Sequence, residues 1–353
     1  MILSIITINY NNAEGLRKTL VSVASQTYAE IEHIIIDGGS TDNSIEVIRE
    51  YESSLASRLS PLASRLKWLS EKDTGIYNAM NKGIEIALGR RIVNEDHTSA
   101  PLASSPHRLI ALDHYIQILN SGDILAAPDV TERMMAALAE RNEKIHNQQS
   151  KQLDNQQLKQ STSDIVNIVE NKIVGVVENK VSKDKSVEIL YGNMIKVNSQ
   201  RQVVGKSGYT EYSLRQFYSS TLNHDCAYIR KDLFDEYGLY DEKLKIVSDW
   251  KWYLQAIGLG RVKPEYVDID VTIFDDGGIS ETNLALRNKE RRQVLEELLP
   301  PAVLWDYDTH AFEMEQMKRL RRWRLYPVVY FMERVCFKFE KWGIVGERLK
   351  VRG

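Results

Sequence analysis

Residues 1–12, MILSIITINYNN, decide the fold, because a compact run of β-branched residues from Ile2 to Ile8 ends abruptly in polar residues at Asn9. Such a run is typical of a strand that is buried on both faces of a parallel sheet. It has no basic residues ahead of it, no small-residue cleavage site and too few apolar residues to span a bilayer. We therefore expect neither a signal peptide nor a transmembrane helix.

The same pattern recurs further along the chain. Apolar strands are predicted over 31–36, 66–69 and 115–119, and amphipathic helices are predicted between them, the first over 13–25. Apolar strands that alternate with helices predict an α/β fold, with a mostly parallel sheet covered by helices on both faces. After residue 187 a hairpin pattern replaces this alternation, so we expect the sheet to become mixed.

The chain is predicted to form one large domain followed by a small extension. The domain spans residues 1–300, and a helical, basic extension covers 301–353. Three stretches interrupt the alternating pattern, at about 53–65, 90–112 and 141–186. The last of these is rich in Gln, Asn and Lys, a composition that buries little apolar surface. We interpret all three as surface insertions that are partly disordered.

The bulk composition excludes several classes of protein. The chain has 353 residues, of which 43% are hydrophobic and 27% charged, and this suits a globular protein with a sizeable core. A net charge of -3 argues against a nucleic-acid binder. Only two cysteines are present, which argues against a disulfide scaffold and fits a reducing compartment such as the cytoplasm.

Polar clusters follow the predicted strands at the points where the strands end. They occupy residues 9–12, 37–42, 70–73 and 120–123. Because the carboxyl ends of parallel strands open at one edge of a sheet, a ligand site is expected there. Each cluster alone also fits a helix cap or a tight turn. Asp123 is a natural ligand for Mg²⁺ or Mn²⁺, although Asn-Ser-Gly-Asp is also an ideal turn composition.

A further candidate is the segment 248–250, Ser-Asp-Trp, which opens a predicted helix. Ser248 suits the N-cap position, and Asp249 would lie in the first turn, where the helix dipole favours its charge. The functional alternative is that Asp249 acts as a general base. We expect four carboxylates to converge on a single cleft, namely those of Asp37, Asp73, Asp123 and Asp249.

The order of these motifs resembles the family 2 glycosyltransferases, which share the GT-A fold, a mixed and mostly parallel sheet flanked by helices. The resemblance looks closest to bacterial members that build surface polysaccharide. It covers most of the chain outside the insertions. The matching motifs are, in order, Ser4 to Asn11, Asp37 to Asp42, Glu71 to Gly83, Leu119 to Asp123, Asn223 to Asp225, Ser248 to Trp250 and Asp276 to Ser280.

The resemblance implies roles in donor binding for several matched residues. Thr7 and Asn9, at the end of the first strand, would line the uridine pocket. Asp37 would contact the uracil or the ribose, and Asp73 the base side of the nucleotide. Two further donor-binding residues are expected in the fourth polar cluster, Asn120 and Ser121.

The resemblance also implies a metal ion and a catalytic base. Asp123 falls on the last acid of the family's metal motif, and Asp249 falls on the acid that serves as base. The family commonly has Asp-x-Asp-Asp where this chain has Asn-Ser-Gly-Asp at 120–123, so metal dependence stays open. His224 is a second candidate contact for the metal or the phosphate, with a purely structural histidine as the alternative. Mn²⁺ or Mg²⁺ is the expected cofactor.

These implications predict an inverting, hexosyltransferase-type enzyme. It would move a sugar from a nucleotide-sugar donor, most simply a UDP-sugar, to a hydroxyl group of a glycan or lipid-linked acceptor in polysaccharide biosynthesis. One alternative is a sugar nucleotidyltransferase, but that class needs a glycine-rich, basic phosphate loop where this chain has residues 9–12. The other alternative is a catalytically weak or inactive relative that binds nucleotide sugars. Nucleic acid is not expected as a partner.

The C-terminal extension combines basic and aromatic residues. Arg319, Arg321, Arg322 and Arg324 run into the apolar segment 325–332. Such a composition suits contact with an anionic membrane, at the inner face of the plasma membrane if the acceptor is lipid-linked. The alternative is a helical pair that packs on the catalytic domain or on a second subunit, which would make a homodimer.

Overall fold

The computed structural model describes most of the chain. The described residues are 1–57, 60–94, 96–101, 113–167, 186–198, 200, 202–208, 212, 214–217, 220–275, 283–322, 325 and 327–332. The predicted motif at 276–280 therefore lies outside the described residues, as do parts of the predicted insertions. The chain divides into two compact units, Met1–Arg291 and Arg292–Gly353.

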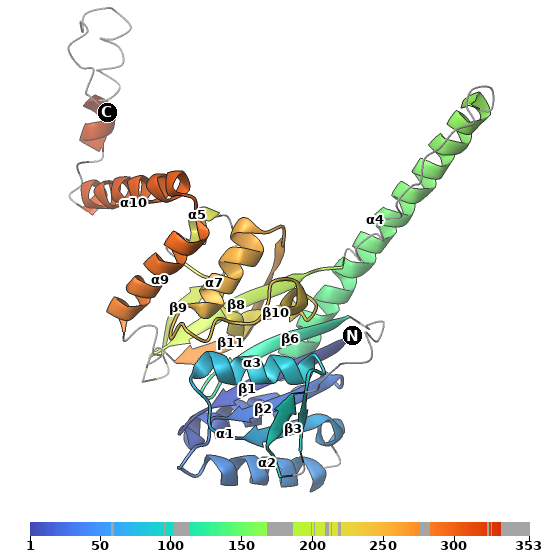
Figure 1. Ribbon diagram of the computed structural model, residues 1–353, viewed down its shortest axis with the longest axis vertical. Coiled ribbons are helices and arrows are strands. Elements are labelled where there is room, and N and C mark those ends of the chain that lie inside the picture. The colour runs from blue at the N-terminus through green and yellow to red at the C-terminus, as the bar shows by residue number, and fades with distance from the viewer. Residues whose placement is uncertain are drawn as a thin grey trace, which may run out of the picture. The chain divides into compact units, whose positions relative to one another are not determined.

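A mixed sheet forms the centre of the first unit (Figure 1). Among the described residues, nine strands join it in the order β3-β2-β1-β6-β10-β8-β11-β7, and β9 pairs with β8. The strands are β1 (Ile2–Asn9), β2 (Ile31–Asp37), β3 (Leu66–Ser70), β6 (His114–Asn120), β7 (Ile124–Leu125), β8 (Ile189–Val197), β9 (Val203–Ser207), β10 (Ala227–Arg230) and β11 (Pro264–Asp275). A separate hairpin joins β4 (Arg91–Val93) to β5 (Ser99–Pro101).

The sheet changes character at β10. Strands β3, β2, β1 and β6 are parallel, whereas β10 is antiparallel to both β6 and β8. Since β6 ends where β10 begins, the chain after β6 and the chain before β10 come together at one edge of the sheet. The mixed, mostly parallel α/β sheet predicted from the sequence is confirmed.

Helices cover both faces of the sheet. Helices α1 and α2 and the first turns of α4 pack on one face, and α3 covers the other (Figure 1). The helices are α1 (Ala13–Ala24), α2 (Ser44–Ser57), η1 (Pro61–Arg65), α3 (Ile76–Ala87), α4 (Val130–Asn167), α5 (Leu214–Phe217), η2 (His224–Cys226), α6 (Leu233–Glu236), α7 (Ser248–Tyr253), the π-helix η3 (Leu254–Leu259), α9 (Leu284–Leu298) and α10 (Pro301–Arg322).

Strand β1 is buried on both faces, which explains why apolar and polar residues do not alternate along it. Leu3 and Ile5 join the core under α1 and α2, while Ile6 meets α3, and all three side chains are fully buried. On the α3 side, a Cβ added to Gly83 would lie 2.4 Å from Ile6 Cγ2, so the helix approaches the strand as closely as a glycine allows. Burial on both faces leaves no position for a polar side chain facing water.

Three local expectations differ from the structure. The sequence from His224 to Ile229 predicts a strand, but His224 lies in the 3₁₀ turn η2 ahead of β10. Val247 rather than Ser248 is the N-cap of α7, and no side chain caps that helix. Of the predicted insertions, residues 53–57 complete α2 and residues 141–167 continue α4, because polar residues without Pro or Gly propagate a helix that the core has already nucleated.

Asn142 of helix α4 is buried. Asn142 Oδ1 accepts a hydrogen bond of 2.7 Å from the backbone N–H of Val187, where the chain returns to the sheet. Its Nδ2 donates to Asp113 Oδ2 at 3.1 Å, just ahead of β6. One side chain thus fixes the points where the chain leaves the sheet and comes back.

The second unit contains the end of α9 and helix α10. Arg292 Nη1 lies 2.7 Å from Asp308 Oδ1, an ion pair that joins the two helices. Trp305 and Phe312 of α10 are exposed by 73% and 66%, so these large apolar side chains face outward. No described helix is both long and apolar enough to cross a membrane.

Candidate active site

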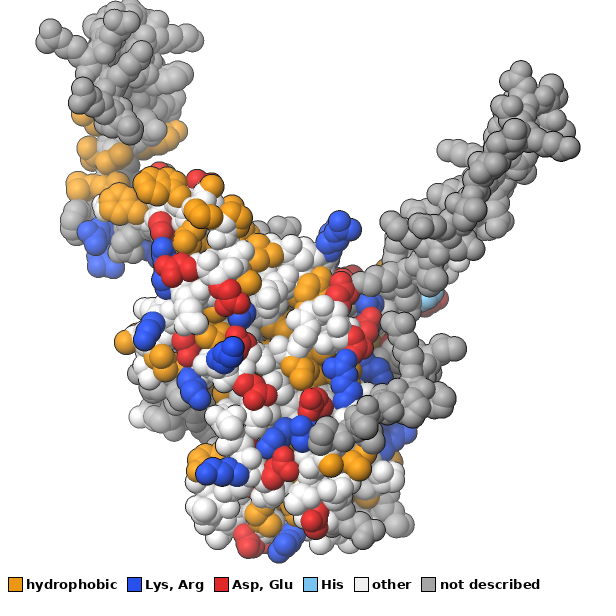
Figure 2. Space-filling view, in the orientation of Figure 1, with side chains coloured by type: hydrophobic (Ala, Val, Ile, Leu, Met, Phe, Trp, Pro, Cys, Tyr) orange, Lys and Arg blue, Asp and Glu red, His pale blue; other side chains and the backbone are white. Residues whose placement is uncertain are grey.

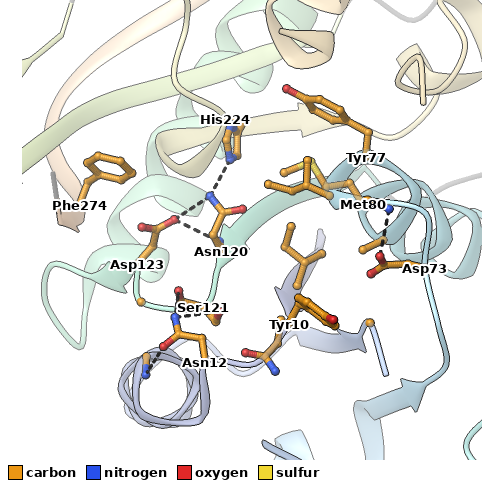
Figure 3. Close-up of a pocket in the computed structure, with 18 of the residues that line it drawn as sticks. Tyr10, Asn12, Asp73, Tyr77, Met80, Asn120, Ser121, Asp123, His224 and Phe274 are labelled. Carbon is orange, nitrogen blue, oxygen red and sulfur yellow. Dashed lines mark hydrogen bonds between the residues drawn. The ribbon is translucent and has the colours of Figure 1, made fainter. Parts of the chain in front are cut away.

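A pocket of about 1140 Å³ opens at the carboxyl ends of the parallel strands (Figure 3). Its walls come from the chain segments that follow β1, β2, β3 and β6, joined by residues 245–249 ahead of and within α7 and by Ile273 and Phe274 of β11. Because these segments are far apart in sequence, the pocket exists only in the folded sheet. Its position is the one at which open α/β sheets bind ligands.

One end of the pocket is formed by Asp73 and the glycines after β2. Asp73 Oδ1 accepts a hydrogen bond of 3.0 Å from the backbone N–H of Gly75. An ideal Cβ at Gly38 would lie only 2.2 Å from Asp73 Oδ2, so the carboxylate rests against bare backbone. Burial raises the pKa of Asp73. Tyr10, which is 63% exposed, lines the same region and presents an aromatic ring to the pocket.

Asp37 lies under this wall and does not line the pocket. Its carboxylate accepts hydrogen bonds from Asn9 Nδ2 at 2.8 Å, Ser40 Oγ at 2.6 Å and Ser70 Oγ at 2.7 Å. It also accepts from the backbone N–H groups of Gly39 and Ser40. A fully buried carboxylate with this many donors is saturated, so Asp37 ties three loop starts together. The direct nucleotide contact expected of Asp37 is not what the structure shows.

Thr7 also lies away from the pocket, contrary to the prediction that it lines a uridine site. Its side chain is fully buried, and its Oγ1 lies 2.9 Å from His33 Nε2. The reason is the alternation of strand side chains, which turns Thr7 into the core under α1 and α2 and leaves its neighbour Ile8 on the pocket wall. Asn9, the last residue of β1, does line the pocket.

Residues 120–123 form a tight turn that places one carboxylate in the pocket. Gly122 has a φ of +114°, a conformation that side chains other than glycine rarely adopt. Asp123 Oδ2 accepts from the backbone N–H and from Nδ2 of Asn120, both at 3.1 Å. Ser121 is held by Asn12 Nδ2, which donates to its carbonyl at 2.8 Å (Figure 3). The turn and the candidate site are therefore the same feature.

Asp123 is buried near a second carboxylate. Burial and the negative charge of Asp225 raise the pKa of Asp123 to about 7. Burial also raises the pKa of Asp225, whose Oδ2 accepts a hydrogen bond of 2.6 Å from Thr272 Oγ1. Two like charges held out of water favour a nearby cation. Among the described residues, no three His, Cys, Asp or Glu side chains come together as a ready-made metal site.

A chain of polar contacts crosses the back of the pocket. Asp249 Oδ1 accepts from the Tyr77 hydroxyl at 2.8 Å, and Asp249 Oδ2 lies 3.3 Å from His224 Nδ1. The other ring nitrogen of His224, Nε2, lies 3.3 Å from Asn120 Nδ2 (Figure 3). Both nitrogens of His224 therefore lie beside polar side chains. This arrangement does not support the metal-ligand role expected of His224.

The charges in this chain of contacts depend on one another. Burial alone would lower the pKa of His224, but its hydrogen bond to Asp249 and the charge of Asp249 raise it to about 9. Burial alone would raise the pKa of Asp249, but its contacts with His224 and Tyr77 lower it. Asp249 is 15% exposed and reaches the pocket as a carboxylate.

The structure thus brings together three of the four predicted carboxylates, those of Asp73, Asp123 and Asp249, in one pocket. Several residues that line it had no predicted role, among them Tyr77 and Lys245. Tyr77 lies inside the matched motif from Glu71 to Gly83. A tyrosine hydroxyl among small polar residues was the sequence feature that could have indicated a role for it. Lys245 follows an irregular segment and gives no signal in the sequence.

Sequence comparison identifies relatives of the chain. Residues 4–97 match the model of the family described as Glycosyl transferase family 2. An uncharacterized glycosyltransferase of Mycobacterium tuberculosis is 34% identical over 137 residues, which are 38% of this chain and 39% of that protein. A PGL/p-HBAD biosynthesis glycosyltransferase of Mycobacterium bovis is 21% identical over 280 residues, 79% of each chain. The match thus spans well under half of the M. tuberculosis relative.

Solved structures share the architecture. S. aureus TarS 1-349 in complex with UDP has a TM-score of 0.50 at 16% identity, over 86% of this chain and 68% of that one. At this identity the likeness bears on the fold. The GT-A-like fold predicted from the sequence is confirmed.

Proposed function

Because residues 4–97 match the model of glycosyltransferase family 2, we propose that the chain transfers a hexosyl group from a UDP-sugar to a hydroxyl of a glycan or lipid-linked acceptor. The observation that carries the proposal is that Asp73, Asp123 and Asp249 line one pocket, at the edge of the sheet where such folds bind ligands. The names of the mycobacterial relatives point the same way.

The uracil binds between Asp73 and Tyr10. The Asp73 carboxylate accepts the N–H of the base, and the exposed Tyr10 ring offers a flat apolar surface. Asn9 lines the pocket beside them and is held in place by Asp37. Asp37 therefore acts on the donor through Asn9. TarS, which shares the fold, was crystallised with UDP.

Asn120 and Ser121 bind the ribose or the sugar hydroxyls. Asn120 Oδ1 is buried and has no hydrogen-bond partner among the residues that the structure describes. A buried amide oxygen without a partner is costly, so a donor hydroxyl that fills this position is favoured. Ser121 lines the pocket beside it, and its backbone is fixed by Asn12 and by Ile8.

A divalent cation, Mn²⁺ or Mg²⁺, fits beside Asp123. Asp123 and Asp225 are buried like charges, and a cation there relieves their repulsion. These cations often take only one or two protein carboxylates and complete their coordination with substrate phosphate oxygens. Asp123 is the residue that would hold the ion. When bound, it supplies positive charge that stabilises the leaving diphosphate.

Asp249 takes the proton from the acceptor hydroxyl as that oxygen attacks the anomeric carbon. His224 and Tyr77 keep it ionised, and it is exposed enough to meet the acceptor. A single base suffices for direct displacement, which inverts the anomeric centre. The transition state resembles an oxocarbenium ion, with positive charge on the donor sugar. The base acts on the acceptor hydroxyl.

Replacing Asp249 by asparagine tests the proposal. We expect UDP binding to be nearly unchanged and turnover to fall roughly 100-fold or more, since general base catalysis contributes at least that much. The assay is UDP release from a panel of UDP-sugars with Mn²⁺ and an acceptor. Equal turnover in the variant would refute the role of Asp249. UDP binding without any turnover in the wild type would favour the inactive relative.

The second unit is proposed to contact a membrane that carries the acceptor. Figure 2 shows hydrophobic side chains exposed over α10. Trp305 and Phe312 of this helix are exposed, as are the residues from Val328 to Met332. Lys318 and Arg322 add positive charge near this apolar surface. The full chain should pellet with vesicles that contain phosphatidylglycerol and not with phosphatidylcholine alone. Concentration-dependent dimerisation without pelleting would favour a homodimer instead.

A further inference from the structure

We propose that Tyr77 is a positioning residue that, together with His224, fixes the orientation of the Asp249 carboxylate. The inference rests on the proposed function, because it assigns Asp249 the role of base. Tyr77 donates its hydroxyl to Asp249 Oδ1 at 2.8 Å, and His224 Nδ1 lies 3.3 Å from Asp249 Oδ2. Each carboxylate oxygen has one partner from a different segment of the chain, so the group cannot rotate without losing a contact.

The backbone fixes the Tyr77 ring. Tyr77 is the second residue of α3, whose N-cap is Gly75 with a φ of +142°. Its side chain is 4% exposed and packs against the Tyr240 ring at a centroid distance of 5.7 Å. The hydroxyl can therefore reach few positions, and the one it occupies is the carboxylate in the first turn of α7.

The same contacts keep Asp249 charged. Without partners, burial would raise the pKa of Asp249, and a protonated carboxyl group cannot accept a proton. Burial and the Asp249 charge raise the pKa of Tyr77 far above its usual range, so Tyr77 remains a donor at any working pH. The titratable groups that surround Asp249 are Tyr77 of α3, His224 of η2, Tyr240 and Tyr253.

Tyr240 provides a matched control. It belongs to the same aromatic cluster and senses the charge of Asp249, yet its buried hydroxyl has no hydrogen-bond partner within the described part of the chain. It does not line the pocket. Replacing Tyr240 by phenylalanine removes the same atom as replacing Tyr77, from a neighbouring ring, without touching the carboxylate.

The experiment compares Tyr77→Phe with Tyr240→Phe. A hydrogen bond to a charged group is worth roughly a 10- to 100-fold change, so we expect kcat of Tyr77→Phe to fall by about that factor. The donor KM should stay within about threefold, and the acidic limb of the kcat–pH profile should move to higher pH. Tyr240→Phe should match the wild type in all three. A selective ¹³C-carboxyl titration of Asp249, assigned with Asp249→Asn, should show its pKa raised in Tyr77→Phe only.

The outcomes separate the two proposals. If the wild type transfers sugar and Tyr77→Phe keeps its kcat and its pH profile, the positioning role is wrong. A raised donor KM with unchanged kcat would overturn it too, by making Tyr77 a binding residue. If the wild type transfers no sugar, the proposed function fails. The carboxyl titration then decides the positioning role alone, since an unchanged Asp249 pKa in Tyr77→Phe would refute it.

Discussion

Replacing Gly38 by alanine tests the proposal that Asp73 holds the base of a nucleotide-sugar donor. An ideal Cβ at Gly38 would lie 2.2 Å from Asp73 Oδ2 and 2.9 Å from Asp73 Cγ, far inside ordinary van der Waals contact. The Gly38 backbone is not left-handed, so alanine is acceptable there apart from this clash. The cheapest relief is for the Asp73 carboxylate to turn away from the pocket wall, which removes it from the base.

The size of the effect follows from the contact that is lost. A hydrogen bond to a charged group contributes about 1.5–3 kcal/mol, and about 1.4 kcal/mol corresponds to a tenfold change in affinity. Gly38→Ala is therefore expected to weaken UDP binding roughly 10- to 100-fold in isothermal titration calorimetry. Gly205→Ala is the control, because its Cβ would meet only Lys196 Cβ at 4.0 Å. Its UDP affinity should equal that of the wild type.

A double variant shows whether the clash acts through Asp73. Gly38→Ala combined with Asp73→Ala should bind UDP as weakly as Asp73→Ala alone, since the methyl group then has no carboxylate to displace. Wild-type affinity in Gly38→Ala would refute the reasoning. So would a further loss of affinity when Gly38→Ala is added to Asp73→Ala.

Two other predictions concern protons and metal. Burial lowers the pKa of His33 to about 3, so below about pH 6.5 the unfolded chain binds a proton that the folded chain does not, and stability falls as the pH drops. In urea unfolding, the wild type should lose about 2 kcal/mol more than His33→Gln between pH 7 and pH 5; equal losses would contradict this. With UDP present, Mn²⁺ should raise the melting temperature of the wild type by a few degrees and leave Asp123→Asn unchanged. An equal response in both would place the cation elsewhere.

The sheet was largely predictable because burial on both faces leaves a continuous apolar run in the sequence. The strands predicted at 31–36, 66–69 and 115–119 are found as β2, β3 and β6, with small changes at their ends. The meeting of Asp73 with Asp123 was predictable for a related reason, since parallel strands end at one edge. The common edge at which parallel strands end made this meeting predictable without knowledge of the side-chain contacts.

The partners of individual side chains were not predictable. Asp37 stands in a polar cluster like the others, but Ser40 and Ser70 saturate it only after two loops are folded side by side. Tyr77 looks like a core aromatic of an amphipathic helix. Its hydroxyl donates a hydrogen bond to Asp249, which lies 172 residues away in sequence. Contacts of this kind depend on tertiary packing, which no local pattern records.

The hydrogen bond between Asn142 and Val187 holds together the two ends of the chain segment between them. The length of that segment can therefore change without changing how the pocket is built. Since both ends of that excursion are anchored at one spot, residues can be added or removed between them at a small, slowly growing cost in loop entropy. Evolution can therefore change the number of residues between these two anchors without altering the residues that line the pocket. For an engineer, it is the natural place to splice in a reporter or a second binding module.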